Sequence, residues 1–233
     1  MSLPDFTGEC FIGGRWLKGA GATFTSIAPA DGAVIWKGAE AGVADVEVAI
    51  AAAREAFPAW RRRPIEERIA FVRAFAKLVD ANRAEMAAII SRSTGKPLWD
   101  AATEATAMIG KAELSIKAYN ERTPTKEAAA GAFVARISHH PHGVMAVLGP
   151  FNFPGHLPNG HIMPALIAGN TVIFKPSEQT PEVAEFTVRL WEQAGIPAGV
   201  VNLVQGARAH AEQLVAHDGV DGVLFTGGVP AGR

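Results

Sequence analysis

The residues best suited to chemistry stand at the ends of two expected β-strands. Residues 144–148 and 171–174 are short apolar runs, and a segment with helical spacing lies between them. This arrangement is typical of a right-handed βαβ crossover. Ligands of open α/β sheets bind outside the carboxyl ends of the strands. We therefore expect Asn152, Lys175 and Glu178, which follow the two runs, to share one rim of the sheet.

Each of these side chains has two interpretations at this point. The NH2 group of Asn152 can stabilise an oxyanion, a role worth roughly 3–4 kcal/mol where it has been measured; it can equally bridge the backbone of a turn. Glu178 can accept hydrogen bonds from both hydroxyls of a ribose while Lys175 donates to them, or the two can form a surface ion pair.

A glycine-rich turn is the third candidate. Residues 222–226 read as a strand, and Gly227, Gly228 and Gly232 follow it. Glycines let a backbone approach a phosphate closely, and a helix N-terminus offers free N–H groups. The spacing is not G-x-G-x-x-G, so ordinary turn chemistry explains the pattern equally well.

No metal site is expected. His139, His140 and His142 are close in sequence, but adjacent residues of a strand point to opposite faces, and no cysteine or acidic residue is near. Cys10 is the one cysteine of the chain, which excludes an internal disulfide and fits a reducing compartment.

The elements that must position these residues alternate along the second half of the chain. From residue 143 the order βαβαβαβ predicts an α/β fold with a Rossmann-like, doubly wound parallel sheet. Residues 43–121 read as helices, most clearly where apolar residues recur every three or four positions from Ile65 to Val79. Residues 9–36, with a hairpin signal at Gly13-Gly14, are expected to form a flap packed on the domain.

Residues 122–142 interrupt the helical pattern and are expected to form an extended ribbon that leaves the body of the domain. We therefore divide the chain into an N-terminal helical part (1–122), a ribbon (123–142) and a Rossmann-like part (143–233).

Composition excludes several classes of function. The net charge is -1 without a basic run, so we expect no nucleic-acid partner. The N-terminus has no secretory pattern, and the longest apolar region is interrupted by Pro, Asn and His, so we expect a soluble, cytoplasmic protein without membrane contact.

Residues 149–181, GPFNFPGHLPNGHIMPALIAGNTVIFKPSEQTP, closely resemble the aldehyde dehydrogenase superfamily. The resemblance covers nearly the whole chain. Further matching positions are Ala56-Phe57 with Trp60, Gly95-Lys96 with Glu104, Val200-Val201-Asn202 and Phe225-Thr226-Gly227. Residues 155–162 resemble the branch that oxidises N-succinylglutamate 5-semialdehyde in arginine catabolism.

The resemblance implies a role for each matching residue. Asn152 is implied to be the catalytic oxyanion donor, and Lys175 and Glu178 the ligands of the adenosine ribose; a carboxylate there favours NAD, since it would repel a 2′-phosphate. The ribbon at 127–139 is implied to belong to an oligomerisation hairpin of a homo-oligomer, and the substrate is implied to be a small aldehyde. The full set of implied cofactor contacts is Leu148, Pro150, Phe151, Lys175, Ser177, Glu178, Phe225, Thr226, Gly227, Gly228 and Gly232.

The chain also departs from the family pattern. Gly228 stands where members usually have Ser, and Ala207 and Ala211 where they usually have Gly. The family's catalytic Cys and general-base Glu follow the Phe-Thr-Gly-Ser motif, so we expect this chain to lack the catalytic domain and to be inactive alone. A non-catalytic NAD-binding or assembly module is the alternative.

Overall fold

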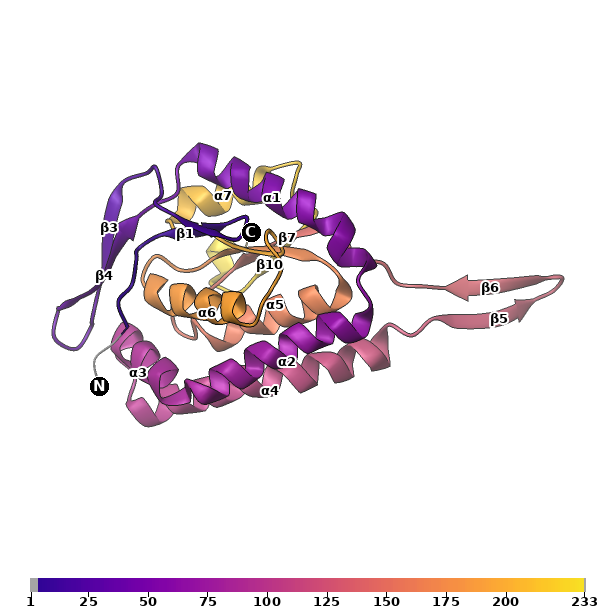
Figure 1. Cartoon of the computed structure of the whole chain (residues 1–233), viewed down its shortest axis with the longest axis horizontal. Coiled ribbons are helices and arrows are strands. Elements are labelled where there is room, and N and C mark those ends of the chain that lie inside the picture. The colour runs from indigo at the N-terminus through magenta and orange to yellow at the C-terminus, as the bar shows by residue number, and fades with distance from the viewer. Residues whose placement is uncertain (1–3, 233) are drawn as a thin grey trace.

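The computed structural model describes residues 4–232, which fold around a six-stranded sheet (Figure 1). Its strand order is β10-β7-β8-β9-β1-β2. The strands are β1 (Cys10–Ile12), β2 (Arg15–Leu17), β7 (Val144–Leu148), β8 (Thr171–Lys175), β9 (Val201–Leu203) and β10 (Gly222–Phe225).

The second half of the chain builds the parallel part of the sheet. Strands β7, β8, β9 and β10 pair in parallel and alternate with helices α5 (His156–Ala168), α6 (Pro181–Gln193) and α7 (Arg208–Ala216). This confirms the expected α/β class and the βαβαβαβ order.

Side chains of β7 alternate between two cores, as a sheet covered on both faces requires. Val144 and Ala146 pack against helix α1 (Val43–Arg62), whereas Met145 and Val147 face the opposite core. In Figure 1, α1 and α7 lie on one side of the sheet, and α5 and α6 on the other.

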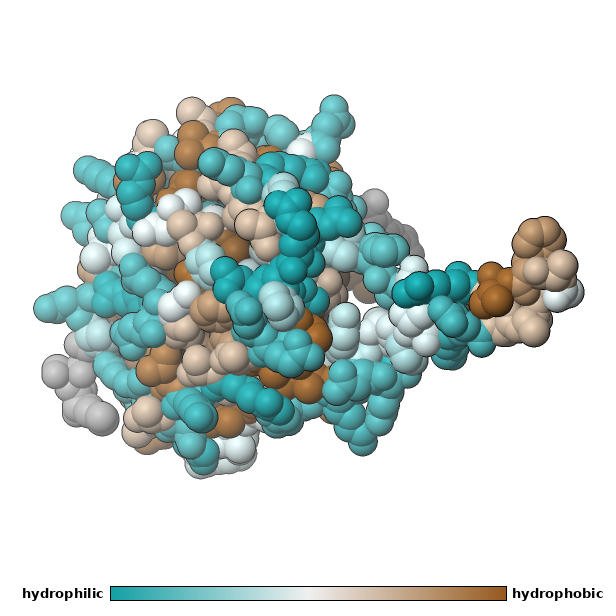
Figure 2. All heavy atoms as spheres, turned by 45° about the vertical axis from the view of Figure 1, so that its right-hand side comes forward, coloured by the Kyte–Doolittle hydropathy of each residue, from teal (hydrophilic) through white to brown (hydrophobic). Residues whose placement is uncertain are grey.

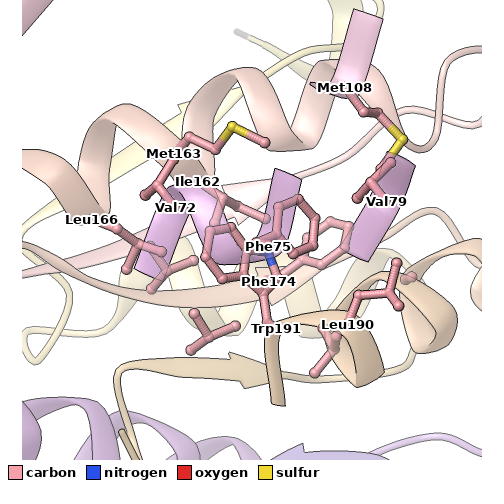
Figure 3. Packing of buried hydrophobic residues seen from close by; sticks show 14 of the residues in the cluster. Val72, Phe75, Val79, Met108, Ile162, Met163, Leu166, Phe174, Leu190 and Trp191 are labelled. Atoms are coloured by element: carbon pink, nitrogen blue, oxygen red, sulfur yellow. The ribbon is translucent and has the colours of Figure 1, made fainter. Parts of the chain in front are cut away.

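Three further helices form an outer layer over α5 and α6: α2 (Ile65–Ala81), α3 (Arg83–Thr94) and α4 (Leu98–Arg122). The apolar stripe predicted from Ile65 to Val79 faces inward, and Val72, Phe75 and Val79 are fully buried. Phe75 stacks on Trp191 of α6 at 3.9 Å between ring centroids (Figure 3). This outer layer holds α5 in a fixed place relative to the sheet.

The N-terminal strands differ from the expected flap. β1 and β2 form a hairpin through Gly13 and Gly14, both at positive φ, and β1 joins β9 in an antiparallel pair. The sheet is therefore mixed rather than purely parallel. β3 (Thr23–Ile27) and β4 (Val34–Ala39) form a separate two-stranded sheet.

The ribbon is a hairpin of β5 (Lys126–Ala130) and β6 (Phe133–Ile137) that projects from the body (Figure 1). Every residue of its two strands is exposed. None of the helices in the described residues is long and apolar enough to cross a bilayer.

Candidate functional site

A cavity of about 470 Å³ opens at the carboxyl ends of β7, β8 and β10. Its walls are Gly149, Pro150, Phe151, Asn152, Leu157, Lys175, Ser177, Glu178, Phe225, Thr226, Gly227, Gly228 and Ala231. The structure thus brings together all the site residues predicted from the sequence except Leu148 and Gly232. What these residues bind stays a prediction.

Leu148 and Gly232 do not line the cavity but adjoin residues that do. Leu148 is the last residue of β7 and packs in the core shared with α1. Gly232 abuts the ring of Phe225, because a Cβ atom there would lie 3.1 Å from a ring carbon. At Gly227 the same atom would lie 2.4 Å from the ring, so any side chain at 227 would displace Phe225. Phe225 is partly exposed, so its ring can move, and this contact alone does not require glycine at 227.

Lys175 and Glu178 form the ion pair that one interpretation of the sequence predicted. The Lys175 Nζ lies 3.6 Å from the Glu178 Oε2 atom. Lys175 is buried, and this burial lowers its pKa, with the nearby Glu178 carboxylate opposing the change. Glu178 is exposed, so its carboxylate is accessible from the cavity, whereas the Lys175 side chain is largely buried in the wall.

The Asn152 loop is held by two residues from outside the sheet. The ammonium of Lys96 donates to the main-chain carbonyl of Asn152 (3.0 Å) and lies 4.0 Å from the centre of the Phe153 ring. It also pairs with Glu104 of α4 at 2.8 Å. The other carboxylate oxygen of Glu104 accepts hydrogen bonds from the N–H groups of Gly155 and His156, where α5 begins.

The carboxamide of Asn152 has no partner of its own in the part of the chain that the structure describes. Among residues 4–232 it makes no hydrogen bond within the protein, which argues against the turn-bridging interpretation. Its main-chain carbonyl is held by Lys96 while its side chain lines the cavity, where the NH2 group is free to donate to a ligand.

Sequence reasoning missed the parts of the site that depend on distant contacts. Leu157 and Ala231 line the cavity, and His161 of α5 lies 2.9 Å from the Thr226 hydroxyl. Lys96 and Glu104 entered only as matching positions of the resemblance, and no local pattern indicated that they hold the Asn152 loop.

The described residues contain neither a reactive thiol nor a cluster of metal ligands. Cys10 is buried in β1, and burial raises the pKa of its thiol to about 11. A thiol with so high a pKa is not a nucleophile near neutral pH. Across the residues with described positions, no cluster of three His, Cys, Asp or Glu side chains is arranged to hold a metal ion.

Comparison with known proteins gives the family. The model of the aldehyde dehydrogenase family matches residues 16–233. The chain belongs to the aldehyde dehydrogenase family. It is 54% identical over 222 residues to the N-succinylglutamate 5-semialdehyde dehydrogenase of Chromobacterium violaceum, covering 95% of this chain and 46% of that protein.

Solved structures of family members share the fold. A NAD-dependent benzaldehyde dehydrogenase from Corynebacterium glutamicum superposes with a TM-score of 0.92 at 30% identity, covering 100% of this chain and 52% of that one. An NADP-dependent glyceraldehyde-3-phosphate dehydrogenase from Bacillus halodurans, solved with NADP, gives 0.90 at 28% identity, covering 98% and 50%. The chain thus spans about half the length of the relatives it matches, and these relatives use either nicotinamide cofactor.

Proposed function

We propose that the cavity binds NAD, and that Asn152 is the oxyanion donor when the whole protein oxidises an aldehyde to a carboxylate. The observation that carries this proposal is the shared wall of one cavity: the Asn152 carboxamide, the Lys175–Glu178 pair and the Gly227-Gly228 turn. When bound, NAD would accept a hydride from the substrate.

The residues fit this cofactor. Glu178 and Lys175 offer an acceptor and a donor for vicinal ribose hydroxyls, and the turn at Gly227 and Gly228 offers bare backbone to a pyrophosphate. The remaining proposed contacts are Leu148, Pro150, Phe151, Ser177, Phe225, Thr226 and Gly232. The negative charge of Glu178 opposes a 2′-phosphate, which supports NAD over NADP.

We propose N-succinylglutamate 5-semialdehyde as the substrate of the whole protein. The support is the 54% identity to a dehydrogenase of that name, together with the motif at residues 155–162. A cytoplasmic location is proposed with it, because a lone free cysteine fits a reducing compartment.

This chain by itself is proposed to bind cofactor without turning over aldehyde. Covalent oxidation needs a thiolate to form the hemiacetal from which hydride leaves. Cys10 is buried and does not line the cavity, and its pKa of about 11 keeps it protonated. The same observation favours the second candidate, a non-catalytic NAD-binding module.

Calorimetric titration with NAD tests the proposal. We expect the chain to bind NAD, Glu178→Ala to weaken binding by about tenfold, the effect of losing one to two charge-assisted hydrogen bonds, and NADP to bind less tightly than NAD. Glu212→Ala, an exposed carboxylate of α7 paired with Arg208, is the matched control and should bind as the wild type does. Absence of NAD binding in the wild-type chain would contradict the proposal.

A further inference from the structure

Lys111 of α4 lies against Gly160 of α5, which has no side chain. Gly160 does not line the proposed cofactor site. A Cβ atom at Gly160 would lie 3.3 Å from the Nζ and 3.4 Å from the Cε of Lys111. These spacings are tighter than most Cβ contacts, so a side chain at residue 160 would crowd the end of the lysine side chain and make it shift slightly. Gly160 thereby leaves a place for an ammonium group beside the helix.

This ammonium has no partner of opposite charge within residues 4–232. Lys111 is partly buried, yet among residues 4–232 it forms no ion pair with a carboxylate, whereas Lys117, further along the same helix, pairs with Glu121. Its ammonium therefore has donors free for the carboxylate of a ligand, and such charge-assisted hydrogen bonds are the stronger kind.

Two histidines of α5, His156 and His161, lie near Lys111 of α4. Residues three and four apart are neighbours on a helix, which places His156 next to Gly160. The Nδ1 atom of His156 is buried without a hydrogen-bond partner. Burial and then the charge of Lys111 lower the pKa of both His156 and His161, so the Lys111 ammonium lies near both imidazoles. Glu104 also faces His156, but hydrogen bonds from Gly155, His156 and Lys96 already occupy its carboxylate.

The same face of α5 continues into the cavity that contains Asn152. Leu157, three residues before Gly160, lines that cavity, and His161 is hydrogen-bonded to Thr226, which also lines it. Gly155 directly precedes α5 and belongs to the loop that contains Asn152. At about 1.5 Å of rise per residue, Gly160 lies roughly 8 Å from Gly155 along the helix axis. A ligand that reaches from Asn152 along α5 would meet Lys111 at its far end.

We propose that Lys111, flanked by His156, binds the carboxylate that ends the acyl group of an N-acylated amino-aldehyde substrate. This inference rests on the proposed function and adds the residue that selects the substrate. An N-succinyl group ends in such a carboxylate. The partly buried Lys111 ammonium, with its donors free, is suited to bind it.

The test uses a stable mimic in which a methyl group replaces the aldehyde. N-succinyl-L-norvaline keeps both carboxylates of the substrate, and N-butanoyl-L-norvaline lacks only the terminal one. Binding is followed by chemical-shift changes of the backbone amides of residues 155–157 and 159–162 in the ¹⁵N-labelled chain. We expect N-succinyl-L-norvaline to bind, and Lys111→Met to weaken it about tenfold, the effect of one charge-assisted hydrogen bond.

Two controls make the result specific. Lys117→Met removes a lysine from the same helix and should bind as the wild type does. N-butanoyl-L-norvaline should bind weakly, and equally to the wild type and to Lys111→Met. Circular dichroism shows whether each variant is folded, and Lys111→Gln replaces Lys111→Met if the latter is not.

The two proposals fail separately. NAD binding with equal affinity of N-succinyl-L-norvaline for the wild type and Lys111→Met would overturn the carboxylate site alone. Absence of any binding of N-succinyl-L-norvaline to the wild type would also overturn it, whatever the NAD titration gives. Loss of NAD binding with an intact Lys111 effect would overturn only the cofactor proposal.

Discussion

Glu182, in the first turn of α6, is buried with a carboxyl group that lacks a hydrogen-bond partner among the described residues. The hydroxyls of Ser26 and Ser93 lie near it, but they donate to the carbonyls of Gln179 and Ile89. Burial therefore dominates and raises the pKa of Glu182 to about 6. Glu185, equally buried, is instead satisfied by Trp36, Gly8 and Arg189.

This shift predicts a pH dependence of stability with a definite sign. The folded-state pKa of about 6 exceeds the ordinary value of 4.5. The stabilisation that protonated Glu182 gives is therefore fully present below pH 4.5 and is lost as the pH rises through 6. The loss is about 2 kcal/mol, at 1.36 kcal/mol per pKa unit. Relative to the wild type, Glu182→Gln should gain about that much unfolding free energy between pH 4.5 and 7.

Urea unfolding at a series of pH values measures this difference. Glu55→Gln, at an exposed position of α1, is the control and should stay parallel to the wild type at every pH. A constant offset between Glu182→Gln and the wild type across this range would show that Glu182 does not titrate as described.

At the scale of elements, α4 holds the beginning of α5. The first N–H groups of a helix have no partner within the helix. Glu104 satisfies those of Gly155 and His156 from a neighbouring helix, and Lys96 links the same carboxylate to the Asn152 carbonyl. The oxyanion donor thus depends on packing between α4 and α5 as much as on its own strand.

Glu104→Ala should therefore destabilise the fold strongly. It leaves the N–H groups of Gly155 and His156 without their acceptor. It also removes the nearer carboxylate of the largely buried Lys96, which keeps Asp100 at 3.8 Å. Breaking a buried pair costs about 3–5 kcal/mol. Urea unfolding measures the loss. The control is Glu113→Ala on the same helix, where an exposed pair with Arg73 should contribute about 1 kcal/mol or less. Equal losses in the two variants would contradict the capping role.

The elements that the sequence predicts well are those with local signals. The period of α2 and the strand–helix alternation after residue 143 were visible without any long-range knowledge. β1 was not assigned to the sheet, because a three-residue apolar run carries no sign of its partner β9, far along the chain. Glu104 was hidden for the same reason, since its contacts with Gly155 and His156 span more than fifty residues. Strand ends, by contrast, placed Asn152, Lys175 and Glu178 on one rim, because one topological rule brings them together. Most other residues of the cavity wall were given by the family resemblance.

At the scale of the whole molecule, the ribbon of β5 and β6 stands out because all residues of its strands are exposed. Figures 1 and 2 show it extending away from the body, with hydrophobic atoms on its outer portion. Paired residues share a face of an antiparallel ribbon. One face therefore carries Phe133 and Ile137 opposite Ala130 and Lys126, while the other carries an ion pair between Arg136 and Glu127. Exposed apolar surface of this kind marks an interaction site.

We propose that this apolar face joins copies of the chain into a homo-oligomer, with residues 127–139 as the contact. Replacing Phe133 and Ile137 by Ser should shift the sedimentation coefficient toward that of a monomer. The unfolding free energy per chain of the monomer should change by less than about 0.5 kcal/mol, because neither side chain packs on the body. Val134→Ser, on the opposite face of the same strand, is the matched control and should leave the assembly intact.

A wild-type chain that sediments as a monomer at tens of micromolar, or a double variant that sediments as the wild type does, would rule out this contact. The double variant also tests the site. If it no longer assembles but binds NAD as tightly as the wild type does, the cavity is complete within one copy.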